Sequence, residues 1–142
     1  MEKSELKDKI IKLISKTQLA SLATTENGKP WVRYVMMSGE SDLTLYTTTF
    51  SSARKVQQIK ENNNVNVIIG GDEKHFKNPH INVQGTAQIV TNLETKQKCW
   101  DEHLKRFFTG PEDPDFSVIE ISPQVIEYTS GDALKPEIYT VS

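Results

Sequence analysis

The chain has 142 residues, with 17 Lys and Arg against 19 Asp and Glu, which gives a net charge of −2 at pH 7. This length predicts one domain over residues 1–142, and the near-neutral charge excludes the basic surface that nucleic-acid-binding domains carry. The highly charged N-terminal segment excludes a signal peptide and a membrane span, and the single cysteine, Cys99, excludes an intrachain disulfide. We therefore expect a cytoplasmic protein that binds neither nucleic acid nor a membrane.

The first third of the chain predicts a helix followed by antiparallel strands. Apolar residues at helical spacing predict a helix over about 4–16. Alternating patterns then predict strands at about 18–25 and 30–38, because the Asn27-Gly28 pair between them is typical of a two-residue hairpin turn. A third strand is expected to begin at Leu43.

The middle of the chain predicts a helix between two strands. Val56 and Ile59 lie at helical spacing, and the run ENNN ends that helix. The segment VNVIIG is predicted to be a buried strand, and INVQGTAQIV an alternating one. Gly85 within the second of these strands indicates a bulge or the close approach of another group.

The last third predicts a further helix and two short strands. Asn92 can cap a third helix that runs to about Phe107, and Ser122-Pro123 separates two strands in FSVIEISPQVIEY. The tail from about residue 130 is expected to be irregular. Because the strands come mostly in hairpins, the predicted fold class is mainly β (α+β): a six- to seven-stranded antiparallel barrel with peripheral helices.

The segment LYTTTFSSARKV gathers hydroxyl and basic side chains at a predicted strand-to-helix junction. These side chains are Thr47, Thr48, Thr49, Ser51, Ser52, Arg54 and Lys55. A helix N-terminus offers free N–H groups and a positive dipole end, so the junction can bind a phosphate, with Arg54, Lys55 and Arg33 as charged ligands. In the alternative interpretation the serines cap the helix and the cations are solvated. The sequence leaves both open.

Three segments together resemble the FMN-binding split barrels related to pyridoxamine 5′-phosphate oxidase: LASLATTENGKPWVRYVMM, LYTTTFSSARKVQQIKENNNVNVII and INVQGTAQIV. The later segment RFFTGPEDPDFSVIEISPQVIEY is similar to the general stress protein branch of that family. The resemblance spans about residues 6–130. It implies a split β-barrel, an FMN cofactor and a homodimer with the flavin at the subunit interface. FAD shares the first phosphate and is the alternative cofactor.

The resemblance also implies which residues bind the cofactor. The matching positions, together with Ser52 of the junction, are Arg33, Val35, Met36, Met37, Ser38, Tyr46, Thr47, Arg54, Lys55 and His80. Of these, Arg33, Arg54 and Lys55 would contact the phosphate. The backbone of residues 35–37 would pass the edge of the isoalloxazine ring, and His80 would act across the dimer interface.

Two departures from the family argue against oxidation of pyridoxamine phosphate itself. Ser38 replaces the lysine that closes the first motif in the vitamin oxidases, and GDALKPEIYTVS lacks their C-terminal Trp and Arg/His substrate motif. The functions left open are a flavin-dependent oxidoreductase that uses NAD(P)H, a non-catalytic flavin-binding or stress-response protein, and a flavin-free dimeric interaction or haem-binding barrel. No catalytic residue is assigned.

The histidines and the cysteine do not indicate a metal site. His75 and His80 lie in the predicted polar loop DEKHFKNPH, without a nearby Cys or an HExxH pattern. Cys99 stands beside Trp100 on the predicted third helix and is expected to be a packed apolar side chain rather than a nucleophile.

Overall fold

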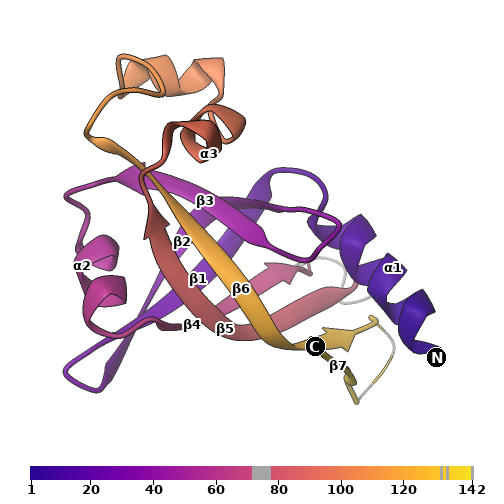
Figure 1. Ribbon diagram of the computed structural model, residues 1–142. Helices are drawn as coiled ribbons and strands as arrows, with labels where there is room; N and C mark the ends of the chain where they lie inside the picture. Colours follow the sequence, from indigo (N-terminus) through magenta and orange to yellow (C-terminus); the bar gives the residue numbers. More distant parts are fainter. Residues whose placement is uncertain (72–77, 132, 134, 142) are drawn as a thin grey trace.

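One antiparallel sheet closes on itself to form a barrel (Figure 1). The computed structural model describes residues 1–71, 78–131, 133 and 135–141. In chain order its elements are α1 (Lys3–Ile14), β1 (Gln18–Glu26), β2 (Lys29–Gly39), β3 (Leu45–Phe50), α2 (Arg54–Glu61), β4 (Asn64–Gly70), β5 (His80–Val90), α3 (Leu93–Lys98), the 3-10 helix η1 (Glu102–Arg106), β6 (Phe116–Thr129) and β7 (Glu137–Thr140).

The strand order is β3-β2-β1-β4-β5-β6-β7, and a further pairing of β3 with β6 closes the barrel. β3 pairs with the first half of β6, and β7 pairs with its second half. The helices lie around the outside, with α1 and α2 on opposite sides of the barrel and α3 above β3 in this view (Figure 1). The predicted fold, a mainly β antiparallel split barrel with peripheral helices, is confirmed.

The β1–β2 hairpin has the predicted two-residue turn. Asn27 and Gly28 have φ values of 53° and 75°, and Glu26 pairs with Lys29 across the turn. Left-handed φ values at both central positions match the twist of a hairpin, which is why Asn-Gly is favoured there. The predicted strands agree with β1 and β2 to within about one residue at each end.

Apolar side chains that alternate along the strands fill the barrel. The fully buried ones include Leu22, Met37, Leu45, Val67, Ile69, Ile81, Val83, Ile119 and Ile121. Leu6, Ile10 and Ile14 of α1 join the same core, and they are residues whose helical spacing predicted this helix. Full burial of one such side chain contributes about 1.5–3 kcal/mol, so packing of this face is what holds α1 in place.

β3 begins later than the sequence predicted. Leu43 is buried but has a φ of 75°, and its N–H donates to the carbonyl of Glu40 (2.9 Å). The chain therefore turns at Leu43, and the pairing of β3 with β2 starts at Leu45.

β6 is one continuous strand, where the sequence predicted two. Ser122 and Pro123 lie inside it, and its register against β5 shifts between Gln84 and Gly85. This irregularity confirms the bulge that Gly85 indicated. The register pairs Gln84 with Val125 and Gly85 with Pro123, so Gln124 is the extra residue of the bulge, and pairing continues on both sides of it.

We expect Gly85→Ala to destabilise the protein by about 1–3 kcal/mol. A Cβ at this position would lie 2.5 Å from the Ser122 carbonyl oxygen and 3.0 Å from Pro123 Cα, both of them backbone atoms of β6. Urea unfolding measures the change. Gly110→Ala is the matched control, since its Cβ would meet only the flexible end of Glu112 at 3.1 Å. Equal destabilisation of both variants would contradict the close-approach explanation.

The predicted third helix is wrong in its length. α3 ends at Lys98, and η1 begins as a separate helix with Asp101 as its N-cap. The Asp101 carboxylate accepts a hydrogen bond from the His103 N–H (3.0 Å), and Trp100 packs edge-on against Phe116 at 5.3 Å, so the chain bends between the two helices.

No helix in the described ranges is long and apolar enough to cross a lipid bilayer.

The predicted irregular tail contains a strand. β7 pairs with β6 from Glu137 opposite Tyr128 to Thr140 opposite Val125. Tyr139 is buried in the barrel core. The edge of β6 supplies the hydrogen-bond partners for β7, which is why a segment with so short a pattern of its own becomes a strand.

Candidate functional site

Three cationic side chains converge on one cavity between β2 and α2. Arg33 comes from β2, whereas Arg54 and Lys55 come from the first turn of α2. Together with Trp31 and Val32 they line a cavity of about 310 Å³. The Arg54 guanidinium carbon lies 5.1 Å from the centroid of the Trp31 ring, within the range of a cation–π contact. The fold thus brings Arg33 next to Arg54 and Lys55, a pair of cations from a distant part of the sequence.

The charges of these cations are not neutralised within the described protein. Burial lowers the pKa of Arg33, and the neighbouring Arg54 lowers it further. Burial also lowers the pKa of Lys55, with Arg33 as the second cause. None of the three forms an ion pair with another described residue. Because like charges in a partly buried cavity repel one another, an anion bound there would be stabilised by all three.

The N-terminus of α2 reinforces this preference for an anion. Its N-cap, Ala53, makes no side-chain cap hydrogen bond, and the first turn contains no acidic residue. The first-turn N–H groups and the positive end of the helix dipole therefore favour an anion at this end of the helix.

The interpretation of the junction serines as helix caps is wrong. Ser51 Oγ donates to the carbonyl of Pro114 (2.8 Å) and lies 2.6 Å from Ser117 Oγ, so it ties the junction to the start of β6. Ser52 is exposed. The cap position falls one residue later, on Ala53, because the chain makes a turn closed by the Ala53 N–H and the Phe50 carbonyl (3.0 Å).

Arg33 is held by two buried polar side chains that the sequence did not single out. Its Nη1 donates to Thr24 Oγ1 (2.8 Å) and to the Leu22 carbonyl (3.2 Å), and its Nη2 donates to Gln58 Oε1 (2.8 Å). Thr24 and Gln58 are each only 1% exposed. They come from β1 and α2, so no local pattern connects them with Arg33. The one available signal was a polar residue, Gln58, on the apolar side of a helix next to Ile59.

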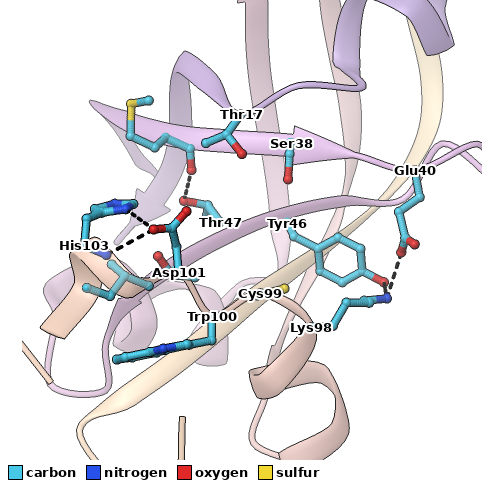
Figure 2. A pocket seen from close by; sticks show the side chains of 13 residues that line it. Thr17, Ser38, Glu40, Tyr46, Thr47, Lys98, Cys99, Trp100, Asp101 and His103 are labelled. Atoms are coloured by element: carbon cyan, nitrogen blue, oxygen red, sulfur yellow. Dashed lines mark hydrogen bonds and ion pairs between the residues drawn. The ribbon is translucent and has the colours of Figure 1, made fainter. Parts of the chain in front are cut away.

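A second cavity, of about 350 Å³, lies beside β2 and β3 (Figure 2). Met36, Ser38, Tyr46 and Thr47 line it from these strands. Ser38 and Tyr46 are direct cross-strand partners, and Thr47 Oγ1 donates to the carbonyl of Met36 (2.6 Å). These contacts fix the strand side of the cavity.

The opposite wall comes from α3 and η1. A small core of Val90, Phe108, Phe116 and Val118 lies next to this segment, and Cys99, Trp100 and Leu104 pack against it. Packing on this core, rather than regular hydrogen bonding to the sheet, holds the wall in place.

Lys98 joins the two walls of the second cavity. Its Nζ donates to Glu40 Oε1 (2.8 Å) and to Tyr46 Oη (3.1 Å), as Figure 2 shows. The hydrogen bond to Glu40, followed by that to Tyr46, raises the pKa of Lys98, and burial raises the pKa of Tyr46. Both groups therefore stay protonated at neutral pH and can act as hydrogen-bond donors beside the cavity.

The remaining polar groups of this wall do not form a nucleophilic or metal site. Burial raises the pKa of the Cys99 thiol, which stays protonated. His103 Nδ1 lies 2.6 Å from Asp101 Oδ1 on the exposed surface. Within residues 1–71, 78–131, 133 and 135–141, no three His, Cys, Asp or Glu side chains are grouped to hold a metal ion. His75 and most of the predicted polar loop lie outside these ranges.

The predicted cofactor residues divide between the two cavities. Arg33, Arg54 and Lys55 line the first, and Met36, Ser38, Tyr46 and Thr47 line the second. Val35 and Met37 are buried in the barrel core, so only their backbone atoms can face a ligand. Ser52 and His80 line neither cavity. His80 is the first residue of β5 rather than a loop residue, and it pairs with Gly70 of β4.

Comparison with known proteins identifies the family to which the sequence belongs. A family model described as pyridoxamine 5′-phosphate oxidase matches residues 6–130, and the chain therefore belongs to this family. The chain is 32% identical to general stress protein 26 of Bacillus subtilis (strain 168) over 136 residues, which cover 96% of each protein. The predicted resemblance is confirmed.

Solved structures support the same assignment. General stress protein 26 from Bacillus anthracis str. Sterne is 33% identical with a TM-score of 0.82, and the match covers 96% of this chain and 98% of that one. A Clostridium acetobutylicum protein related to general stress protein 26 has a TM-score of 0.80 at 19% identity, covering 99% of this chain and 97% of that one. At that identity the second match shows the shared fold alone.

Proposed function

We propose that the chain is an FMN-binding split-barrel domain whose phosphate site is formed by Arg33, Arg54 and Lys55. The observation that carries this proposal is the convergence of these cations, none paired with a described carboxylate, on one cavity at the N-terminus of α2. A phosphate would offset their mutual repulsion, and the guanidinium groups suit its oxygens in a forked geometry. FAD shares this first phosphate and is the alternative cofactor.

The second cavity is the proposed site of the flavin ring. Arg33 and Ser38 are five residues apart on β2, which corresponds to roughly 17 Å along a strand, a length comparable with that of an extended FMN molecule. The ring would lie against Met36, Ser38 and Tyr46, which line this cavity. Bound FMN would supply hydride and electron transfer. The residues of the chain would anchor its phosphate, orient its ring and leave space near Lys98 for a second molecule.

The outer face of β1 and β2 is the proposed dimer interface. Leu19 on β1 and Val32, Tyr34 and Met36 on β2 are 59%, 69%, 77% and 53% exposed. The register places Leu19 opposite Met36, so the face is continuous across both strands. An exposed apolar face of this kind is typical of a protein–protein contact. Val32 also lines the first cavity and Met36 the second, so a second copy on this face would border both.

Titration with FMN and riboflavin tests the flavin proposal. FMN fluorescence should be quenched with a Kd of about 1 μM or lower, equivalent to about −8 kcal/mol. Riboflavin lacks the phosphate and should bind at least ~10-fold more weakly, since one charge-assisted contact is worth about 1.5–3 kcal/mol. Absence of binding to both FMN and FAD would contradict the proposal.

The proposed activity is flavin-dependent oxidoreduction of a small molecule, with NAD(P)H as the reductant. It is favoured by the size of the second cavity and by the hydrogen-bond donors Lys98 and Tyr46 beside it. Steady-state oxidation of NAD(P)H with a panel of acceptors is the test, and flavin binding without turnover would support a non-catalytic flavin-binding stress protein instead. Pyridoxamine 5′-phosphate is not the expected substrate, because Ser38 replaces the lysine of the vitamin oxidases and β7 carries no Arg or His.

A further inference from the structure

Gln58 lies on the same helix as Arg54 and Lys55 and contacts Arg33, the third cation of the first cavity. It follows Arg54 by four residues and Lys55 by three, so it continues the same side of α2 one turn further on. Its side chain is buried, and its Oε1 accepts hydrogen bonds from Arg33 Nη2 (2.8 Å) and from Thr24 Oγ1. Gln58 therefore connects the helix that supplies two of the cations to the strand that supplies the third.

All the hydrogen-bond acceptors around Arg33 in the described chain are neutral. They are Thr24 Oγ1, Gln58 Oε1 and the backbone carbonyls of Leu22 and Trp31. Arg33 is half-buried, and an arginine withdrawn from water is usually paired with a carboxylate. Neutral acceptors fix the orientation of the guanidinium without cancelling its charge. The full positive charge of Arg33 is thus kept for an anion in the cavity that Arg33 lines.

The Gln58 amide supplies this neutral acceptor, but its other end lowers the stability of the fold. Its Nε2 is buried and has no hydrogen-bond partner in the described chain, and an unsatisfied buried donor is destabilising. An apolar side chain would avoid that cost but would remove an acceptor from Arg33. A glutamate would keep the acceptor but would neutralise the guanidinium. Among side chains of this size, the amide is the one that is both an acceptor and uncharged.

We propose that Gln58 and Thr24 are the positioning pair that makes the site selective for phosphorylated flavins over riboflavin. They act through Arg33, by holding its guanidinium in place beside Arg54 and Lys55 with its charge intact. This inference rests on the proposed function, because it assumes that the cavity binds the phosphate of a flavin.

Gln58→Glu tests the pair, with FMN and riboflavin as the probes. The variant preserves the shape of the side chain but places a carboxylate against the Arg33 guanidinium. We expect the Kd for FMN to rise by ~10–100-fold and the Kd for riboflavin to change by less than ~3-fold. The dependence of FMN affinity on salt concentration should also weaken, because the site loses net positive charge.

Gln57→Glu is the matched control. It makes the same change of charge one residue away on α2, but Gln57 is exposed and its side chain bonds only to Glu61 (3.2 Å) within the described chain. This variant should keep the preference of the wild type for FMN. If it loses that preference as strongly as Gln58→Glu, the effect comes from net charge on the helix and the positioning role is overturned.

Thr24→Val is the second test variant and decides the question if Gln58→Glu does not fold. Valine matches threonine in shape but offers no acceptor to Arg33, so FMN binding should weaken by ~3–10-fold with little change for riboflavin. Equal weakening for both flavins, or an unchanged preference for FMN, would assign the pair a purely structural role. A wild-type protein without any preference for FMN would overturn the phosphate site itself, and this inference with it.

Discussion

Replacing Arg54 and Lys55 together with alanine is expected to weaken FMN binding by ~100-fold and riboflavin binding by less than ~3-fold. Both cations line the first cavity, and only FMN carries the phosphate that they would contact. Charge-assisted contacts are strong, but Arg54 is exposed and solvent screens part of its contribution, which is why the expected effect is not larger. Parallel fluorescence titrations with the two flavins measure the difference.

A control for this double substitution is Lys9→Ala with Lys12→Ala on α1. Both lysines are exposed, and their removal changes the net charge by the same amount on the opposite side of the barrel (Figure 1). This control should keep the affinity of the wild type for FMN. Equal loss of FMN and riboflavin binding in the Arg54/Lys55 variant would mean that these residues act through folding and not through the phosphate.

Tyr34→Glu is expected to convert the proposed dimer into a monomer and to remove FMN binding with it. Tyr34 is 77% exposed, between Val32 and Met36 on the apolar face of β2. In a symmetric dimer that buries this face, each interface would gain two unpaired carboxylates, and the dimer dissociation constant should rise by ~100-fold or more. Sedimentation velocity measures assembly, and FMN titration of the same samples measures the site.

Ile138→Glu provides the comparison for Tyr34→Glu. Ile138 is also a large exposed apolar residue, at 54%, but it lies on β7, which pairs with β6 and not with β1 or β2. The same substitution there should leave both assembly and FMN affinity unchanged. A Tyr34→Glu monomer that binds FMN as tightly as the wild type would show that one subunit is sufficient for the site.

Prediction from the sequence succeeded where structure depends on neighbours along the chain. The Asn27-Gly28 turn needs left-handed φ values that these residues adopt readily, and the spacing of Leu6, Ile10 and Ile14 defines the buried side of α1. Gly85 indicated a bulge or a close approach, because a glycine inside an otherwise regular strand leaves room for another group, but the sequence did not identify that group. The approaching atoms proved to be those of Ser122 and Pro123.

Prediction failed where an element depends on a partner distant in the chain. Pro123 suggested a break in the strand, but the bulge opposite Gly85 lets β6 continue. β7 forms because β6 offers a free edge, and Tyr139 is buried only in the assembled barrel. The third helix ends early because Trp100 packs against Phe116 and Asp101 caps η1.

The sequence by itself determined that this protein is an antiparallel barrel of the pyridoxamine 5′-phosphate oxidase family, with Arg33, Arg54 and Lys55 as its candidate anion ligands. Alternation, turn residues and motif order are local properties, so they can be recognised without coordinates. Only the tertiary structure decided that these cations share one cavity and that Ser51 bonds to Ser117 instead of capping a helix. Likewise, it alone showed that Thr24 and Gln58 hold Arg33. These contacts join residues from different elements, and packing of α2 against the barrel, not any pattern along the chain, brings them within hydrogen-bond distance.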